Sequence, residues 1–229
     1  MSRASTQVDN SPQPPGFLAT PAAGIQKGRG LLVLHAWWGL NETIKTLCRR
    51  LAAEGFVVFA PDLYRGKIAT TIKDAETLGG QLDQNAAQAK SDIADAVTYL
   101  SGRADLTGPE LGVVGLSLGA YYALALSNAD PDRVRAVVVF YGTGHADYSR
   151  SKAAYLGHFG ENDDFEPASN VRSLESTLRA AGRPVTVHTY PGTGHWFLEQ
   201  DRPDAYNEAA AKLAWERTVA FLREELPRS

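Results

Sequence analysis

A serine between two glycines is the strongest chemical signal in this sequence. Ser117 lies at the centre of Gly-Leu-Ser-Leu-Gly, residues 115–119, after an apolar run and before a segment typical of a helix. In a strand–turn–helix context, Gly-x-Ser-x-Gly is a nucleophile elbow, a sharp turn that forces the serine into strained backbone angles. Side chains at the two glycine positions would collide with the neighbouring strand and helix. We predict that Ser117 is a nucleophile; the alternative is a glycine-rich turn with an incidental serine.

A serine hydroxyl needs a base, and two histidines end identical Gly-Thr-Gly-His segments. His145 and His195 each follow an apolar run. In hydrolases with a nucleophile elbow, the chain order is serine, acid, histidine, and the histidine follows the last strand. His145 comes too early, after the first predicted strand beyond the serine. We therefore predict that His195 is the base and that His145 is a loop residue near the pocket.

The acid that orients this base is expected in HFGENDDFEP, residues 158–167. Two neighbouring aspartates, Asp163 and Asp164, compete for the role. In proteins with a nucleophile elbow, the acid commonly lies three residues after a glycine and four before a proline. Gly160 and Pro167 both select Asp163 by this rule. We predict Asp163, with Asp164 as the alternative.

Backbone amides and aromatic side chains are expected to complete the site. The N–H of Leu118, after the nucleophile, and that of Trp37, after an early strand, are the predicted donors to an oxyanion. The predicted pocket residues are Ala36, Trp38, Tyr64, Tyr121, Tyr141 and Trp196. Such walls suit a small, neutral acyl ester. The alternative role of each aromatic residue is packing between sheet and helices.

Short β-rich runs alternate with helical patterns along the chain. The predicted strands are 31–34, 56–60, 111–115, 134–141, 154–159 and 185–190, and the predicted helices are 41–54, 85–101, a segment from about 118, 168–181 and about 204–225. Several strand runs are continuously apolar, which is typical of a parallel sheet buried on both faces. The order predicts an α/β fold with a mostly parallel, doubly wound sheet flanked by helices.

The domain organisation follows from composition. Residues 1–16, rich in Ser, Pro and Gln, are predicted to form a disordered tail, and residues 17–229 a single domain. The irregular stretch 66–82 is predicted to be a helical insertion near the strand ends that could cap the site.

Composition and charge exclude several classes of function. The chain has 229 residues, a net charge of −3 and no basic run, which argues against a nucleic-acid partner. No apolar run approaches the roughly 18 residues that a membrane span needs, so we expect a cytoplasmic protein. The single cysteine excludes an intrachain disulfide, and no metal-ligand or nucleotide-binding spacing occurs. We expect no cofactor, no metal, a small ester or lactone as partner, and a monomer or homodimer.

Together these motifs resemble the dienelactone hydrolase family of the α/β-hydrolase fold. The resemblance rests on HAWWGLN at 35–41, APDLY at 60–64, the elbow, the acid segment and PGTGHWF at 191–197, and it covers about residues 17–223. It implies an ester or lactone hydrolase that needs no cofactor.

Two departures from the best-known members surround the nucleophile. Those members carry cysteine at the Ser117 position and glutamate at the Ala36 position. A thiol needs help to become a thiolate, whereas a serine loses its proton to histidine during attack. A buried carboxylate beside a serine would only carry a desolvation cost. Our hypothesis is therefore an intact serine hydrolase and not a damaged cysteine enzyme.

A third departure concerns the substrate. Members that cleave dienelactone hold its carboxylate with arginines, one of them shortly after the histidine. Here residues 196–199 are Trp-Phe-Leu-Glu, and residues 67–102 contain no arginine. This favours neutral esters. The alternatives are a dienelactone (carboxymethylenebutenolide) hydrolase proper and, from a different class, a non-catalytic ligand-binding relative.

Overall fold

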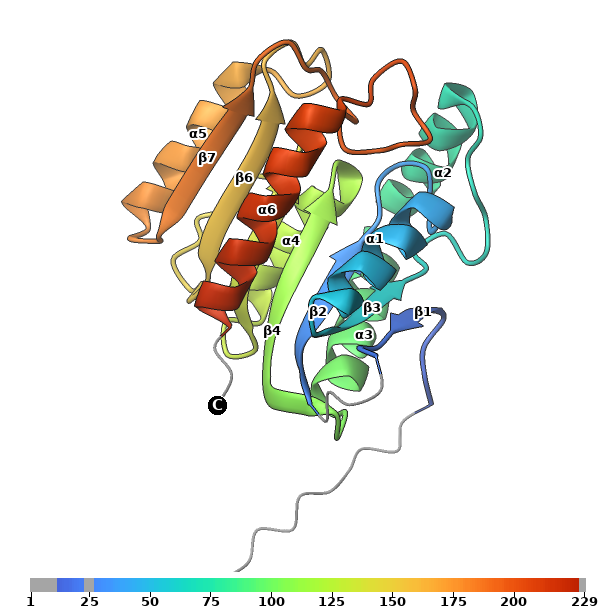
Figure 1. Cartoon of the computed structure of the whole chain (residues 1–229), viewed down its shortest axis with the longest axis vertical. Helices are drawn as coiled ribbons and strands as arrows, with labels where there is room; N and C mark the ends of the chain where they lie inside the picture. The colour runs from blue at the N-terminus through green and yellow to red at the C-terminus, as the bar shows by residue number, and fades with distance from the viewer. Residues whose placement is uncertain (1–11, 23–26, 227–229) are drawn as a thin grey trace, which may run out of the picture.

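A seven-stranded sheet forms the centre of the molecule (Figure 1). The computed structural model describes residues 12–22 and 27–226. The strands are β1 (Gly16–Ala19), β2 (Gly28–Leu34), β3 (Phe56–Pro61), β4 (Leu106–Leu116), β5 (Val134–Phe140), β6 (Ala154–Gly160) and β7 (Val185–Tyr190). The helices are α1 (Glu42–Ala53), α2 (Ile72–Gln84), α3 (Ala86–Ser101), α4 (Leu118–Ala129), α5 (Ala168–Ala180) and α6 (Glu208–Glu225).

The strand order is β1-β3-β2-β4-β5-β6-β7, and every neighbouring pair is parallel except β1 with β3. The predicted α/β class and mostly parallel sheet are confirmed. Each predicted strand overlaps an observed one, but β2 and β4 begin three and five residues earlier than predicted, and Tyr141 has already left β5, with a φ of 38°. Strand β1 was not predicted, because four residues are too short to show a period and this strand depends on the edge of β3.

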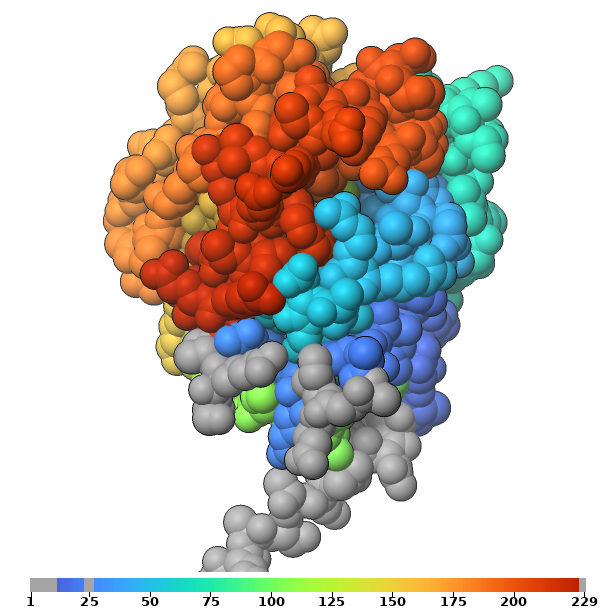
Figure 2. Space-filling view, viewed as in Figure 1, coloured from blue at the N-terminus to red at the C-terminus, as the bar shows by residue number. Residues whose placement is uncertain are grey.

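Helices cover both faces of the sheet. Figure 2 shows α6 and α1 side by side on one face, and α3, α4 and α5 cover the other. Successive β2 residues alternate between the two layers, since Leu31 and Val33 join the core with α1 while Leu32 and Leu34 join the core with α3 and α4. This two-layer burial explains the continuous apolar runs.

Polar side chains decide where three helices begin. The Asn41 side chain accepts the Ile44 N–H at 3.1 Å, so α1 has the cap expected from its sequence. The proposed insertion 66–82 is helical only from Ile72, because Thr71 and Asp74 form a capping box there. Helix α6 begins at Glu208 and not near residue 204, because Asn207 caps it by accepting the Ala210 N–H at 3.0 Å.

The predicted tail, residues 1–16, lies largely outside the described residues. Of its described part, Gln13 accepts a hydrogen bond from the Tyr99 hydroxyl, and Gly16 begins β1. None of the described helices is long and apolar enough to cross a membrane.

Sheet register brings the predicted functional segments to one edge. Leu34 pairs with Gly115, Leu116 with Phe140, and Gly160 with Tyr190. The carboxyl ends of β2, β4, β5, β6 and β7 therefore meet at the same side of the sheet. In open α/β sheets this is the edge where ligands bind.

Candidate active site

Ser117 occupies the sharp turn between β4 and α4. Its backbone angles, φ 50° and ψ −114°, lie in a region that residues other than glycine avoid. A Cβ at Gly115 would lie 2.4 Å from the Gly119 carbonyl oxygen, and one at Gly119 would lie 2.1 Å from that of Leu34. Both glycines are therefore needed for close backbone approach, as the motif predicted. The turn is held from the side by the Ser117 N–H, which donates to the Phe140 carbonyl at 2.9 Å.

A chain of hydrogen bonds runs from this serine to a carboxylate. Ser117 Oγ lies 2.9 Å from His195 Nε2, and His195 Nδ1 lies 2.8 Å from Asp163 Oδ2 and 3.0 Å from Oδ1. A carboxylate accepts only, so the ring proton belongs on Nδ1 and Nε2 is left to accept the serine proton. The His195 side chain is 7% exposed and that of Asp163 is 1% exposed. Water therefore competes little for these bonds.

The two competing aspartates occupy different environments. Asp163 turns inward, and its Oδ1 accepts the backbone N–H groups of Phe165 and Glu166, each at 2.9 Å. These two donors fix the carboxylate while it accepts from His195. Asp164 is exposed at the surface of the same loop. The structure thus brings Asp163 to the ring, although the catalytic role remains a prediction.

The first Gly-Thr-Gly-His segment braces the acid loop. The Thr143 N–H and hydroxyl both donate to the Glu166 carboxylate, at 2.8 and 3.0 Å. This clamp ties the loop after β5 to the loop that carries Asp163, and no local sequence pattern predicts it. His145 is exposed in the loop after β5.

Aromatic rings surround His195. The ring centroids of Tyr141, Phe165 and Trp196 lie 4.8, 5.1 and 5.0 Å from that of the imidazole. The ring centroids of Trp38 and Trp196 are 5.4 Å apart. Phe165 was missed in the sequence, although it is 51% exposed and follows the acid by two residues. An aromatic residue two positions after the predicted acid is the sequence signal that would have found it.

The other predicted pocket residues lie at different depths. Ala36 and Tyr64 are buried, and the Tyr64 ring packs edge-on against His35 at 4.9 Å. His35 Nε2 accepts the Leu63 N–H at 3.3 Å, which supports a structural role at the strand end. Tyr121, on α4, is 42% exposed. Their part in substrate binding remains a prediction.

The two amides predicted to bind an oxyanion both begin new segments. Leu118 is the first residue of α4, and helix geometry leaves its N–H without a partner inside the helix. Trp37 lies in the turn after β2, which the Gly39 N–H closes on the Ala36 carbonyl at 3.1 Å. A methyl group at Gly79 would lie 2.7 Å from Trp37 Nε1, so α2 borders this turn.

Glu199, four residues after the base, is a buried carboxyl group. Its side chain is 1% exposed, and Oε1 accepts the Tyr141 hydroxyl at 2.8 Å. Burial raises the pKa of Glu199 to about 8; the hydrogen bond from Tyr141 and the Arg202 guanidinium lower it, while the Asp201 carboxylate raises it further. Glu199 is therefore mostly protonated at neutral pH.

This protonation predicts a pH-dependent gain in stability for Glu199→Gln. Between the ordinary pKa of 4.5 and the folded value of about 8, the folded chain binds more protons than the unfolded chain. Wild-type stability should therefore fall across this window as pH rises, and glutamine escapes the loss. Each pKa unit is worth about 1.4 kcal/mol, so the variant should gain a few kcal/mol by pH 8.5 and almost nothing at pH 4. Urea unfolding at both pH values checks this, and a pH-independent difference would contradict it.

Within residues 12–22 and 27–226, no group of three or more His, Cys, Asp or Glu side chains could hold a metal ion. Cys48 is buried on α1, and burial raises the pKa of its thiol to about 12, which makes it an inert core residue.

Known proteins share this sequence and architecture. The model of the dienelactone hydrolase family matches residues 15–226. "Protein usf" of Aquifex pyrophilus is 34% identical over 92% of this chain and 93% of that protein, and a "Putative carboxymethylenebutenolidase" of Aquifex aeolicus is 31% identical with the same coverage. The crystal structure of a "Putative Dienelactone Hydrolase" from Klebsiella pneumoniae is 26% identical, with a TM-score of 0.78 over 90% of both chains.

The family match covers nearly the whole described chain, including the elbow and the loops after β6 and β7. It agrees with the resemblance carried by the sequence motifs. The chain therefore belongs to the dienelactone hydrolase family and is a hydrolase with the α/β-hydrolase fold.

Proposed function

We propose that this hydrolase cleaves small, neutral carboxylic esters through a Ser117–His195–Asp163 triad. The observation that carries the proposal is the unbroken chain of hydrogen bonds from Ser117 Oγ through both nitrogens of His195 to Asp163. The strained elbow supports it as well, because backbone strain held by the surrounding structure is typical of functional sites.

The first half-reaction forms an acyl-enzyme. Ser117 Oγ attacks the ester carbonyl carbon while His195 Nε2 takes the serine proton. Asp163 stabilises the imidazolium that results and keeps its Nδ1 proton in place. The amides of Leu118 and Trp37 stabilise the negative carbonyl oxygen of the tetrahedral intermediate. The intermediate collapses, the bond to the alcohol oxygen breaks, and His195 returns its proton to that alcohol.

The second half-reaction releases the acid. His195 takes a proton from water, whose oxygen attacks the acyl carbon. The new tetrahedral intermediate expels Ser117 Oγ, which recovers its proton from the imidazolium. The products are a carboxylic acid and an alcohol, and the enzyme is restored without a cofactor.

Neutral substrates are favoured by the surroundings of the base. The ring neighbours of His195 are Tyr141, Phe165 and Trp196, which offer apolar faces and no positive charge. Phe165 is exposed and can meet a substrate directly.

A dienelactone hydrolase is the second candidate, and two observations favour it. Several relatives, including the Aquifex aeolicus protein, are named "Putative carboxymethylenebutenolidase". In addition, the Arg202 guanidinium lies 3.6 Å over the Trp38 ring, so folding brings one arginine to the aromatic wall. The adjacent Asp201 carboxylate, 3.3 Å away, offsets this charge, which is why we place the lactone second.

A substrate panel separates the two candidates. We expect kcat/KM to fall by roughly tenfold or more from p-nitrophenyl acetate through butyrate to octanoate, because the acyl pocket we propose is small and does not accommodate the added methylenes. An anionic dienelactone should be hydrolysed more slowly than the acetate. Preference for the lactone, together with a selective loss of that activity in Arg202→Gln, would instead establish the second candidate.

A further inference from the structure

Tyr141 lies between the predicted base and a buried carboxyl group. The residue follows β5 directly, and its side chain is fully buried. The centroid of its ring lies 4.8 Å from that of the His195 imidazole, and its hydroxyl donates to Glu199 Oε1 at 2.8 Å. This hydrogen bond, together with packing against the Phe197 ring at a centroid distance of 5.6 Å, holds the ring that packs on the base.

The backbone at this position is strained and close to the nucleophile. Tyr141 has a φ of 38°, which a residue with a side chain adopts only where surrounding contacts impose it. Its N–H donates to the His158 carbonyl at 2.8 Å. A Cβ on the next residue, Gly142, would lie 2.5 Å from the Ser117 carbonyl oxygen. Movement of residues 141–142 would thus disturb both the base and the elbow.

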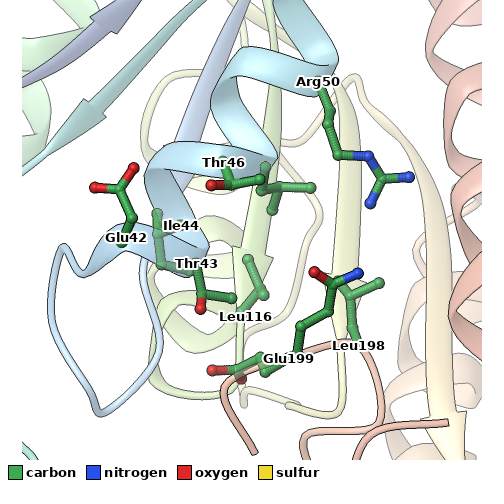
Figure 3. Close-up of a pocket in the computed structure, with 10 residues that line it drawn as sticks. Glu42, Thr43, Ile44, Thr46, Arg50, Leu116, Leu198 and Glu199 are labelled. Carbon is green, nitrogen blue, oxygen red and sulfur yellow. The ribbon is translucent and has the colours of Figure 1, made fainter. Parts of the chain in front are cut away.

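Glu199 lies in the turn that directly follows the base. The Glu199 N–H donates to the Trp196 carbonyl at 2.9 Å, and this closes the turn after His195. Glu199 also borders a cavity between α1 and the loop 198–200, next to Leu116 at the end of β4 (Figure 3). Its Oε2 is buried and has no hydrogen-bond partner among the described residues.

The charged groups around Glu199 are few and mostly engaged. Arg50 and Glu42 of α1 border the same cavity, but Arg50 lies over the Trp215 ring and Glu42 pairs with Arg49. On its own loop, Asp201 and Arg202 act in opposite directions on the pKa of Glu199. The carboxyl therefore has one firm partner, the Tyr141 hydroxyl, and burial favours its neutral form.

We propose that Glu199 is a positioning residue for His195, and that its buried carboxyl holds Tyr141 so that the tyrosine ring keeps the imidazole facing Ser117. This inference rests on the proposed function, since it assigns the role of a residue behind the same triad. Glu199 touches neither the substrate nor the reacting atoms. Its effect reaches catalysis only through the geometry of Tyr141.

Three variants of the full chain test this role: Glu199→Gln, Glu199→Ala and Tyr141→Phe. We expect the glutamine variant to keep kcat on p-nitrophenyl acetate within about twofold at neutral pH, because its amide oxygen still accepts the tyrosine proton. The other two should each lose roughly tenfold in kcat with little change in KM, since displacement of a catalytic group by a fraction of an ångström is costly. Combining Tyr141→Phe with Glu199→Ala should cost no more than either alone, because both remove one hydrogen bond.

Rescue by the conservative variant supplies a readout that a merely structural role would not move. Glu199→Gln should keep kcat at neutral and alkaline pH alike, because its amide oxygen accepts the Tyr141 proton as the wild-type carboxyl does in either charge state, while equally folded Glu199→Ala stays slow. Tyr141→Phe removes the bond without opening a cavity, so it remains informative if Glu199→Ala does not fold.

Two results would overturn the inference while the proposed function stands. One is wild-type kcat in folded Glu199→Ala and Tyr141→Phe; the other is a kcat in folded Glu199→Gln as low as that of Glu199→Ala. If the wild type itself is no faster than Ser117→Ala, the proposed function fails and this inference fails with it.

Discussion

Replacing Ser117 with alanine should lower kcat on p-nitrophenyl acetate by a factor on the order of 10⁶. The alanine lacks the oxygen that forms the acyl bond. In the wild type this oxygen lies 2.9 Å from His195 Nε2, so in the variant the base has no nucleophile to deprotonate. Residual hydrolysis above the uncatalysed rate would come from the oxyanion donors and binding alone. Steady-state kinetics measure the loss, and intact-mass spectrometry should show an acetyl adduct on the wild type that the variant lacks.

Two further variants make this result specific. Ser173→Ala, on the exposed surface of α5, is a matched control that should leave kcat unchanged. Ser117→Cys should be a weaker esterase than the wild type, because Ala36 provides no carboxylate to help form a thiolate. A cysteine variant much faster than the wild type would refute the hypothesis of an intact serine enzyme, and turnover retained in Ser117→Ala would refute the triad.

Asp163→Asn should lower kcat by roughly 10³- to 10⁴-fold, whereas Asp164→Asn should change it by less than about twofold. The Asp163 carboxylate accepts the His195 Nδ1 proton at 2.8 Å and is held by two backbone N–H groups. Asparagine can satisfy those amides with its oxygen but then presents an NH₂ group to the ring. This favours the wrong tautomer, in which Nε2 carries the proton and cannot accept one from Ser117.

The neighbouring aspartate makes this comparison sharp. Both substitutions remove one negative charge from the same loop, so a general electrostatic effect would lower both activities alike. Melting temperatures of the two variants show whether either loss comes from unfolding. A larger loss in Asp164→Asn than in Asp163→Asn would exchange the two roles and contradict the observed geometry.

The sequence alone determines the parts of this protein that depend on short-range patterns. The elbow is one of them, because a strand, two glycines and a helix within one short segment constrain the backbone locally, and Ser117 indeed has a positive φ. The strand positions are another, since burial on both faces demands continuous apolar runs. The cap of α1 at Asn41 is a third, because a side chain three residues from its partner needs no distant contact.

The chain order of serine, acid and histidine limits the candidates for the acid to two neighbouring aspartates. Pattern alone cannot show which of two adjacent carboxylates turns inward. The fold decides this through the amides of Phe165 and Glu166, which bind Asp163 and leave Asp164 at the surface. Their own position depends on the clamp between Glu166 and Thr143, which lie 23 residues apart.

Only the tertiary structure joins Tyr141 to Glu199, which are 58 residues apart. In the sequence, Glu199 is an acidic residue at the end of an aromatic segment, and nothing local shows that it is buried. The sheet brings the ends of β5 and β7 to one edge, and there a tyrosine hydroxyl meets the carboxyl. Burial and charge state depend on every group that packs around a side chain, so they are decided by the folded chain and not by any short stretch of it.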